Sequence, residues 1–179
     1  MLRDPQKLEI DNNLVEIVKG DVRDYVSVLE LVKGCSAVLS TLGQPKGESP
    51  IFSDATKNII TAMNHFDINR YIAVTGLSID VPTDKKSPKT RQLSDWMKQN
   101  FPEIIADKQK EFSLLSNSIL NWTLVRLPMI EQTDNSGNIN ISLEDCPGDK
   151  ISATDLANFM ITQLTDTTYI GKSPFIASI

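Results

Sequence analysis

Compact apolar runs alternate along this chain with segments of helical periodicity. Three of the runs, residues 37–43, 70–78 and 122–128, pass from apolar residues straight into a turn that contains Gly or Pro. Short runs of this kind are typical of strands buried in a parallel sheet. Open α/β sheets bind ligands at the carboxyl ends of such strands. The three strand ends therefore predict one crevice lined by three loops.

The segments between these strands have the features of helices. Apolar side chains repeat at i, i+3, i+4 and i+7 over residues 25–32, with Asp24 in position to cap the helix and Gly34 just after its end. Further helices are predicted over about 55–66, over about 95–117 with an interruption near Phe101-Pro102, and after the capping residue Ser152. Further strands are predicted at residues 15–18, 138–143 and 174–177, and a mobile polar loop or lid at 80–91.

The order of these elements predicts the fold class. Strands that alternate with helices indicate an α/β fold with a parallel sheet, helices on both faces and right-handed crossovers. A length of 179 residues suits one domain with a full core, so we expect a single Rossmann-like domain over residues 1–179.

Composition and charge exclude several function classes. The net charge of −5 argues against a nucleic-acid-binding face, and no apolar run approaches the roughly 20 residues that span a bilayer. The amino terminus lacks the apolar core of a signal peptide. Cys35 and Cys146 show no metal-ligand spacing. We therefore expect a cytoplasmic protein without a metal site, membrane or nucleic-acid partner.

Nucleophilic chemistry finds little support in the sequence. The single histidine, His65, lies beside Phe66 on the apolar face of a predicted helix, which argues against a Ser-His-Asp triad. Thr75 and Ser78 at a strand end could contact a ligand or satisfy backbone groups. The tryptophans, Trp96 and Trp122, are interpreted as core or near-core residues.

Four stretches together resemble the NmrA-like, atypical short-chain dehydrogenase family, which includes NAD(P)H-binding flavin and biliverdin reductase-like proteins. They are LRDPQKL from Leu2, KGDVRD from Lys19, STLG from Ser40 and SILNWTLVRLP from Ser118. The tail KISATDLANFM resembles the closing helix of the family. The resemblance implies an NAD(P)-binding domain, with NADP or NAD as cofactor and NADP favoured by Arg3.

The resemblance also implies which residues bind that cofactor. Arg3 would meet the adenosine ribose phosphate, Asp21 and Val22 would border the adenine, and Leu42 and Gly43 would lie beside the adenine-side ribose and pyrophosphate. The nicotinamide would lie near a second group, made up of Thr75, Gly76, Leu77, Leu127, Pro128 and Met129. Lys108 aligns with the lysine of the catalytic Tyr-Lys pair, whereas Ile104 occupies the tyrosine position and cannot transfer a proton. Lys108 could therefore contact the cofactor or be a solvated helix lysine, and the catalytic residues stay unassigned.

One feature of the family is missing. The G-x-x-G-x-x-G turn, which brings backbone N–H groups to the pyrophosphate, does not occur in the sequence. Relative to the family the first β-α unit is absent, so the chain is either a truncated version or a variant that lost its phosphate site. Because the missing strand would lie in mid-sheet, we expect residues 15–18 to move beside residues 37–42, or a neighbouring chain to fill the gap.

These observations favour an NAD(P)-binding oxidoreductase-like protein. If active, it would be an NAD(P)H-dependent flavin- or quinone-type reductase that transfers hydride to a small-molecule electron acceptor. Two alternatives remain open, a non-catalytic dinucleotide-sensing or protein-interaction module of the NmrA type and an incomplete chain without cofactor binding. An exposed sheet edge also leaves self-association as a homo-oligomer open.

Overall fold

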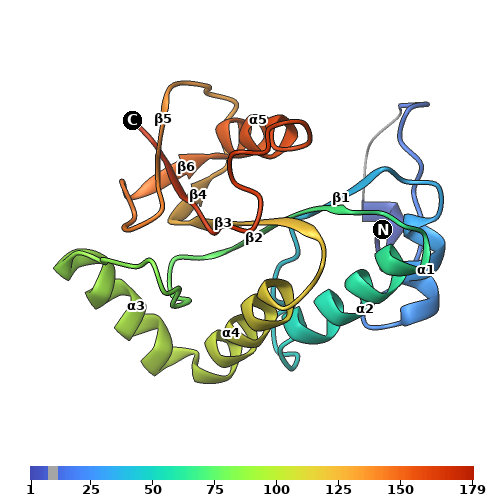
Figure 1. Ribbon diagram of the computed structural model, residues 1–179, viewed down its shortest axis with the longest axis horizontal. Coiled ribbons are helices and arrows are strands. Elements are labelled where there is room, and N and C mark those ends of the chain that lie inside the picture. Colours follow the sequence, from blue (N-terminus) through green and yellow to red (C-terminus); the bar gives the residue numbers. More distant parts are fainter. Residues whose placement is uncertain (8–11) are drawn as a thin grey trace.

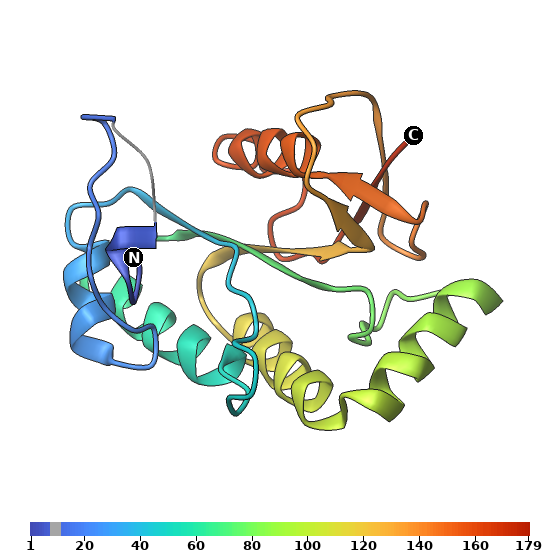
Figure 2. The same ribbon diagram turned by 180° about the vertical axis from the view of Figure 1, so that it is seen from behind.

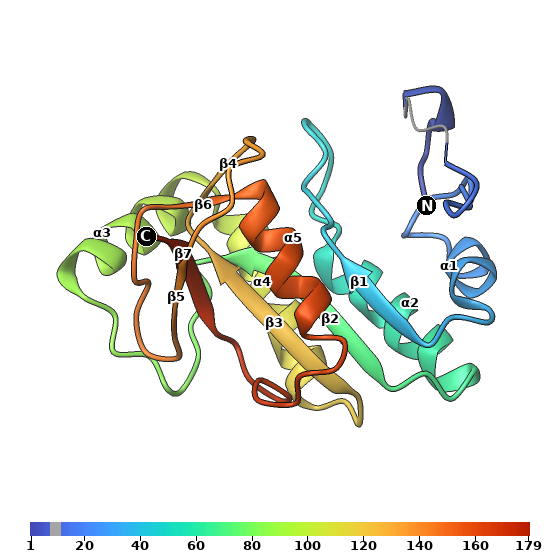
Figure 3. The ribbon, with the colours of Figure 1, turned by 90° about the horizontal axis from the view of Figure 1, so that it is seen from above.

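A mostly parallel sheet with helices on both faces forms the centre of the molecule. The computed structural model describes residues 1–7 and 12–179. Helices α1, α2 and α4 lie on one side of the sheet and α5 on the other, as Figures 1 and 3 show. The helix bounds are Tyr25–Val32 for α1, Phe52–His65 for α2, Pro88–Asn100 for α3, Pro102–Ser116 for α4 and Ala153–Thr162 for α5, after a short 3₁₀ turn at Pro5–Lys7.

The main sheet has the strand order β1-β2-β3-β7-β5. Neighbouring strands are parallel, except that β5 runs antiparallel to β7. A second sheet pairs β4 with β6 in parallel. The strand bounds are Ala37–Ser40 for β1, Arg70–Gly76 for β2, Asn121–Leu127 for β3, Met129–Glu131 for β4, Ile139–Ser142 for β5, Lys150–Ser152 for β6 and Phe175–Ser178 for β7. The predicted Rossmann-like α/β architecture is confirmed.

Alternate residues of β2 supply the two halves of the core. Tyr71 and Ala73 pack against α1, α2 and α4, whereas Ile72 and Val74 pack against α5. Helices cover both faces of this strand, so successive side chains are apolar whichever face they point to. This explains the continuous apolar run in the sequence. Burial on both faces is consistent with the place of β2 inside the sheet, between β1 and β3.

The predicted helix ends are largely confirmed. The Asp24 carboxylate accepts hydrogen bonds from the backbone N–H groups of Val26 and Ser27, and Ser152 Oγ accepts one from Asp155 N–H. Gly34 has a φ of 78°, a left-handed conformation that favours glycine after a helix. None of the helices among the described residues is long and apolar enough to cross a bilayer.

Residues 15–18 do not join the sheet, so the prediction that they move beside β1 is wrong. They form no strand, and the chain nearby is held by a parallel bridge between Leu2 and Lys19. Leu2 N–H donates to Val18 C=O at 2.9 Å, and Gly20 N–H donates to Leu2 C=O at 3.1 Å. The end of this segment therefore pairs with the amino terminus instead of with β1. In the described part of the chain β1 pairs with β2 alone, and a neighbouring chain at its outer edge stays a prediction.

The segment 80–91 is a polar loop only as far as residue 87, and its predicted mobility stays a prediction. Ser87 Oγ caps α3, which begins at Pro88. Lys86 is buried, and its Nζ donates to Ile79 C=O at 2.7 Å and to Asp80 Oδ1 at 3.0 Å. Asp84 pairs with Arg126 of β3. Buried cations that need partners therefore tie the segment to neighbouring parts of the fold.

A polar cluster is buried between α2, α4 and β2. Asp107 caps α2 from the neighbouring helix, accepting hydrogen bonds from Phe52 N–H at 2.8 Å and Ser53 N–H at 3.1 Å. One turn further along α4, Glu111 accepts a hydrogen bond from Thr56 Oγ1 at 3.2 Å, and its Oε2 has no protein partner in the described structure. Burial raises the pKa of Glu111 to about 7, although the positive charge of Lys108 opposes the shift.

Arg126 ties β3 to two other parts of the fold. The side chain is fully buried and stacks on Phe175, 3.5 Å from the ring centroid. Its guanidinium pairs with Asp84 and donates to the backbone carbonyls of Ser173 at 2.8 Å and Leu143 at 3.2 Å. Removing it would take the short ion pair from a largely buried carboxylate, which would keep Lys86 Nζ at 3.5 Å, and would leave the Ser173 carbonyl without its guanidinium donor.

We therefore expect Arg126→Met to lower the free energy of unfolding by about 3–5 kcal/mol, measured by urea denaturation. The matched control is Lys150→Met, which removes an exposed pair with Glu131 and should cost less than about 1 kcal/mol. A loss at Arg126 no larger than that of the control would contradict this account.

Glu111 should make stability depend on pH. Its folded pKa lies above the ordinary value of 4.5, so the folded protein holds a proton that the unfolded chain releases between about pH 4.5 and 7. The free energy of unfolding should therefore fall as pH rises through that window, by on the order of 2 kcal/mol. Glu111→Gln should remove this slope in denaturant titrations at pH 5 and 8. Glu103→Gln, an exposed position in the same helix, should keep the wild-type slope, and equal slopes in all three proteins would refute the assignment.

Candidate functional site

The carboxyl ends of β1, β2 and β3 lie along one edge of the sheet. In the parallel ladders Ser40 pairs with Ala73, and Gly76 pairs with Leu127. Strand β1 therefore ends three residues before β2 and β3 do, and Gly43 lies in the loop that follows it. This arrangement confirms that the three predicted strand ends lie along one edge. The space beside them is divided into two hollows, not one crevice.

The first hollow lies at the amino-terminal side of that edge, and we call it the N-terminal hollow. Its volume is about 200 Å³. It brings together five of the residues that the sequence singled out, from three separate segments: Arg3, Asp21, Val22, Leu42 and Gly43. Met1 and Ile51 add apolar lining.

Charged groups surround this hollow in a chain of ion pairs. The Arg23 guanidinium binds Asp21 through two hydrogen bonds, from Nε at 2.9 Å and from Nη2 at 2.5 Å. The same guanidinium donates from Nη1 to Glu48 Oε2 at 2.7 Å, and Arg3 Nη1 donates to Glu48 Oε1 at 2.7 Å. The hydrogen bonds from Arg23 lower the pKa of Asp21 to about 2, and those from Arg3 and Arg23 lower the pKa of Glu48. Both carboxylates are therefore ionised at neutral pH.

The second hollow lies between the ends of β2 and β3 and helix α3, and we call it the α3 cleft. Its volume is about 720 Å³. One wall consists of five residues that the sequence predicted at the nicotinamide: Gly76, Leu77, Leu127, Pro128 and Met129. Leu77 N–H donates to Leu127 C=O at 3.1 Å, so a backbone hydrogen bond holds the ends of the two strands together beyond the ladder.

Helix α3 supplies an apolar wall that the sequence analysis missed. Leu93, Trp96 and Met97 line the cleft at helical spacing, and Cys146 to Asp149 close its third side. Trp96 is 54% exposed, so the interpretation of this residue as core is wrong. Figure 2 shows the reason, because α3 reaches out from the sheet at the side of the molecule opposite the N-terminal segment. The sequence does contain a signal for this wall. Ser87-Pro88 is a helix start, and Leu93, Trp96 and Met97 follow at helical spacing.

Two of the predicted site residues lie outside both hollows. Thr75 is buried at the end of β2, on the side that faces α2 and α4, and its Oγ1 has no protein partner in the described structure. Lys108 lies in the buried cluster of α4, with its Nζ 4.3 Å from the centroid of the Phe52 ring. Burial lowers the pKa of Lys108. Lys108 is half-buried and lines neither hollow, so a cofactor contact by Lys108 stays a prediction.

The backbone at the two strand-end glycines is accessible to a ligand. A Cβ built on Gly43 or Gly76 would meet no atom within 4 Å, and neither glycine has positive φ. Folding therefore does not demand glycine at these positions, whereas the close approach of a flat ligand to the backbone would. The chain thus has a small hollow ringed by charged groups and a larger apolar cleft along one sheet edge, and its sequence lacks the glycine-rich turn of the family.

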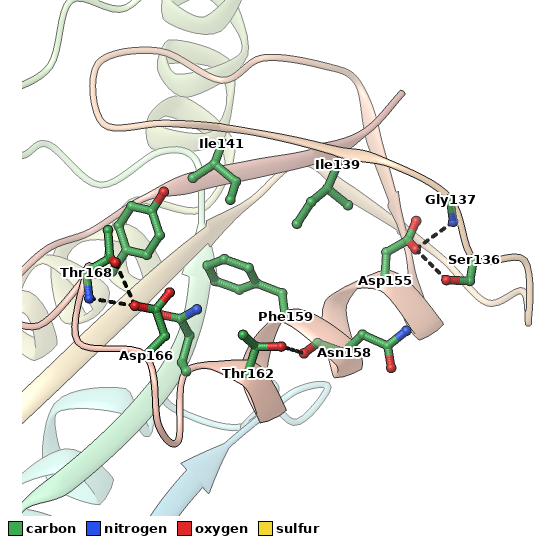
Figure 4. A pocket seen from close by; sticks show the side chains of 12 residues that line it. Ser136, Gly137, Ile139, Ile141, Asp155, Asn158, Phe159, Thr162, Asp166 and Thr168 are labelled. Atoms are coloured by element: carbon green, nitrogen blue, oxygen red, sulfur yellow. Dashed lines mark hydrogen bonds between the residues drawn. The ribbon is translucent and has the colours of Figure 1, made fainter.

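A third hollow, of about 430 Å³, lies between α5 and β5 and is drawn in Figure 4. Its acidic groups are committed to the protein itself. Asp155 accepts hydrogen bonds from Gly137 N–H at 2.9 Å and Ser136 Oγ at 3.2 Å, and Asp166 accepts one from Thr168 N–H at 2.8 Å. These carboxylates organise the corner of the fold. Among the described residues, no group of His, Cys, Asp and Glu side chains is arranged to hold a metal ion.

Comparison with known proteins agrees with this geometry. The profile of a family described as NAD(P)H-binding matches residues 1–167. Among solved structures, the anaerobillin reductase ChuY from Escherichia coli O157:H7 is 17% identical, with a TM-score of 0.73 over 90% of this chain and 74% of that chain. A short-chain dehydrogenase/reductase from Veillonella parvula in complex with NADP is 18% identical, with a TM-score of 0.71 over 98% of this chain and 76% of that chain.

A Rossmann-fold NAD(P)-binding family protein from Shigella flexneri is likewise 18% identical, with a TM-score of 0.72 over 98% of this chain and 77% of that chain. At these identities the neighbours show a common fold, whereas the family match covers most of the sequence and includes every residue that the sequence analysis singled out for cofactor binding. The resemblance inferred from the sequence is thus confirmed at the level of fold and cofactor class. The chain belongs to the NAD(P)H-binding family.

Proposed function

We propose that this protein is an NAD(P)H-dependent reductase whose acceptor is a small molecule with an apolar ring system, of flavin or quinone type. The observation that carries the proposal is the pairing of two unlike hollows along one sheet edge. The N-terminal hollow is charged and small, and the α3 cleft is apolar and larger. A dinucleotide has ends of matching character, a phosphorylated adenosine and a flat nicotinamide.

In this proposal each hollow holds one end of the cofactor. Asp21 and Val22 border the adenine, and Arg3 faces a phosphate of the adenosine ribose. Leu127 and Pro128 pack against the nicotinamide ring, and the open backbone at Gly76 lets the ring approach. When bound, NAD(P)H supplies the hydride, so the protein's task is to orient the ring and exclude water from its reacting face.

The acceptor would lie in the remaining space of the α3 cleft. Leu93, Trp96 and Met97 offer an apolar wall on which a conjugated ring can stack. Ile104 holds the position of the family's catalytic tyrosine and has no proton to give. The acceptor's proton would therefore come from water at the exposed side of the cleft, which suits flavins and quinones because their reduced heteroatoms exchange protons with solvent.

A second candidate function is dinucleotide sensing without turnover. The same two features that limit catalysis, Ile104 at the tyrosine position and the missing glycine-rich turn, favour it. Titration calorimetry with NADPH and with NADH, followed by assays of their oxidation with a flavin and with a quinone, separates the candidates. Micromolar binding with turnover supports the reductase, and binding without turnover supports the sensor. The absence of binding at millimolar concentration would refute both.

Filling the backbone at the strand ends should abolish cofactor binding without harming the fold. We expect Gly43→Val and Gly76→Val each to weaken dinucleotide binding tenfold or more, measured by calorimetry, because the new side chain occupies the space that the ligand needs. Gly137→Val is the matched control, since Gly137 also has open space around it but lines the corner beside α5. Loss of binding in all three variants, or in none, would contradict the proposed site.

A further inference from the structure

Two guanidinium groups converge on one carboxylate beside the N-terminal hollow. Arg3 and Arg23 come from separate segments, and each donates to a different oxygen of Glu48 at 2.7 Å. Both arginines line the hollow, whereas Glu48 belongs to the loop that follows β1. A carboxylate that bridges two arginines offers each of them one anionic oxygen, as a phosphate would.

The loop holds Glu48 in this position through its own hydrogen bonds. Gln44 Nε2 donates to the backbone carbonyls of Pro45 at 3.1 Å, Glu48 at 2.9 Å and Ser49 at 3.2 Å. Gly47, just before Glu48, has a φ of 77°, a left-handed conformation that L side chains rarely adopt. The tight turn and the glutamine contacts fix where the Glu48 backbone lies. Its side chain thus starts from a defined place beside the arginines.

Among the side chains that line the N-terminal hollow, the same two arginines are the best suited to bind a phosphate on the adenosine. Arg23 is already held by Asp21, which leaves Nη1 directed at Glu48, and Arg3 offers Nη1. A phosphate that approached either group would face a carboxylate carrying the same sign of charge and using the same donors. Ligand phosphate and Glu48 therefore cannot both occupy the pair without repulsion.

We propose that Glu48 is a specificity-determining residue that competes with the 2′-phosphate of NADP(H) for Arg3 and Arg23. This inference rests on the proposed dinucleotide function and concerns the adenosine end of the same site. NAD(H), which lacks that phosphate, leaves the Glu48 contacts in place. NADP(H) must displace Glu48, so part of its attraction to Arg3 is offset. The choice between the two cofactors is set by this competition, not by Arg3 alone.

The test compares wild type with Glu48→Gln, titrated by calorimetry with NADPH and NADH at low ionic strength. We expect NADPH to bind the variant roughly threefold to tenfold more tightly than wild type, because two exposed ion pairs no longer compete. NADH affinity should stay within about twofold. Glu30→Gln is the control, since it removes the same charge from an exposed position on α1 and should change neither affinity.

Salt provides an independent readout of the same competition. Raising the ionic strength to about 1 M should erase most of the gain with NADPH, because exposed charges are then screened within a few ångströms. Adenosine 2′,5′-bisphosphate and adenosine 5′-phosphate should reproduce the difference between NADPH and NADH. These fragments do not reach the α3 cleft, so they isolate the adenosine end.

The outcomes distinguish the inference from the function on which it rests. An unchanged NADPH affinity in Glu48→Gln, or an equal change for NADPH and NADH, would overturn the role of Glu48 and leave the dinucleotide function standing. If neither cofactor nor fragment binds either protein, both the proposed function and this inference fail. Thermal melts of the two variants within a few degrees of wild type would show that differences in binding do not come from unfolding.

Discussion

The parallel pairing of β2 with a strand on each side is the constraint on which the rest of the structure depends. β1 and β3 both run in its direction, and the two ladders fix where each strand ends. The β2–β3 register brings Gly76 and Leu127 to a common level, and β1 ends three residues earlier, where Ser40 pairs with Ala73. A slip of one residue would turn the apolar side chains of β2 from one covered face to the other. Because both faces of β2 are buried, the packing that forms the core also fixes the register of the strands and therefore the position of their ends.

The elements next to this strand could be predicted from sequence because local chemistry decides them. Asp24, Ser152 and Gly34 mark helix ends through side-chain hydrogen bonds or a left-handed backbone, and neither requires knowledge of distant residues. Strand β3, Asn121–Leu127, coincides with the strand predicted at residues 122–127, whose apolar residues are Trp122, Leu124, Val125 and Leu127. The fold class, and most of the residues at the sheet edge, were accessible in this way.

The errors arose where a distant partner decides the conformation. Residues 15–18 have the composition of a strand, but Leu2 takes up the backbone groups that follow them. Lys86 reads as a surface charge in a polar loop, but the carbonyl of Ile79 and the carboxylate of Asp80 hold it in a buried position. Lys108 is half-buried, with its ammonium over the Phe52 ring and near the Glu111 carboxylate. In each case the partner is either far away in the sequence or placed by a turn that the sequence pattern does not predict.

The site divides into a charged part and an apolar part, and this division shapes how a dinucleotide would bind. Each hollow alone offers a modest contact area. When one end of a ligand is bound in one hollow, however, its other end is held near the second hollow, and this raises the overall affinity. Such linkage can offset the lack of a glycine-rich turn at the pyrophosphate. The ion pairs of Arg3 and Arg23 work in the opposite direction, since a phosphate must exchange with carboxylates that are already bound.

The central claim is that one dinucleotide occupies both hollows at the same time. Two-dimensional NMR of the ¹⁵N-labelled protein during titration with NADH tests it most directly, because every backbone amide reports separately. The account predicts that the amides of Gly43, Gly76 and Leu127 shift together along one saturation curve, while Gly137 and Asp155 in the corner beside α5 stay unchanged. Shifts confined to that corner, or separate curves for the two hollows, would contradict it.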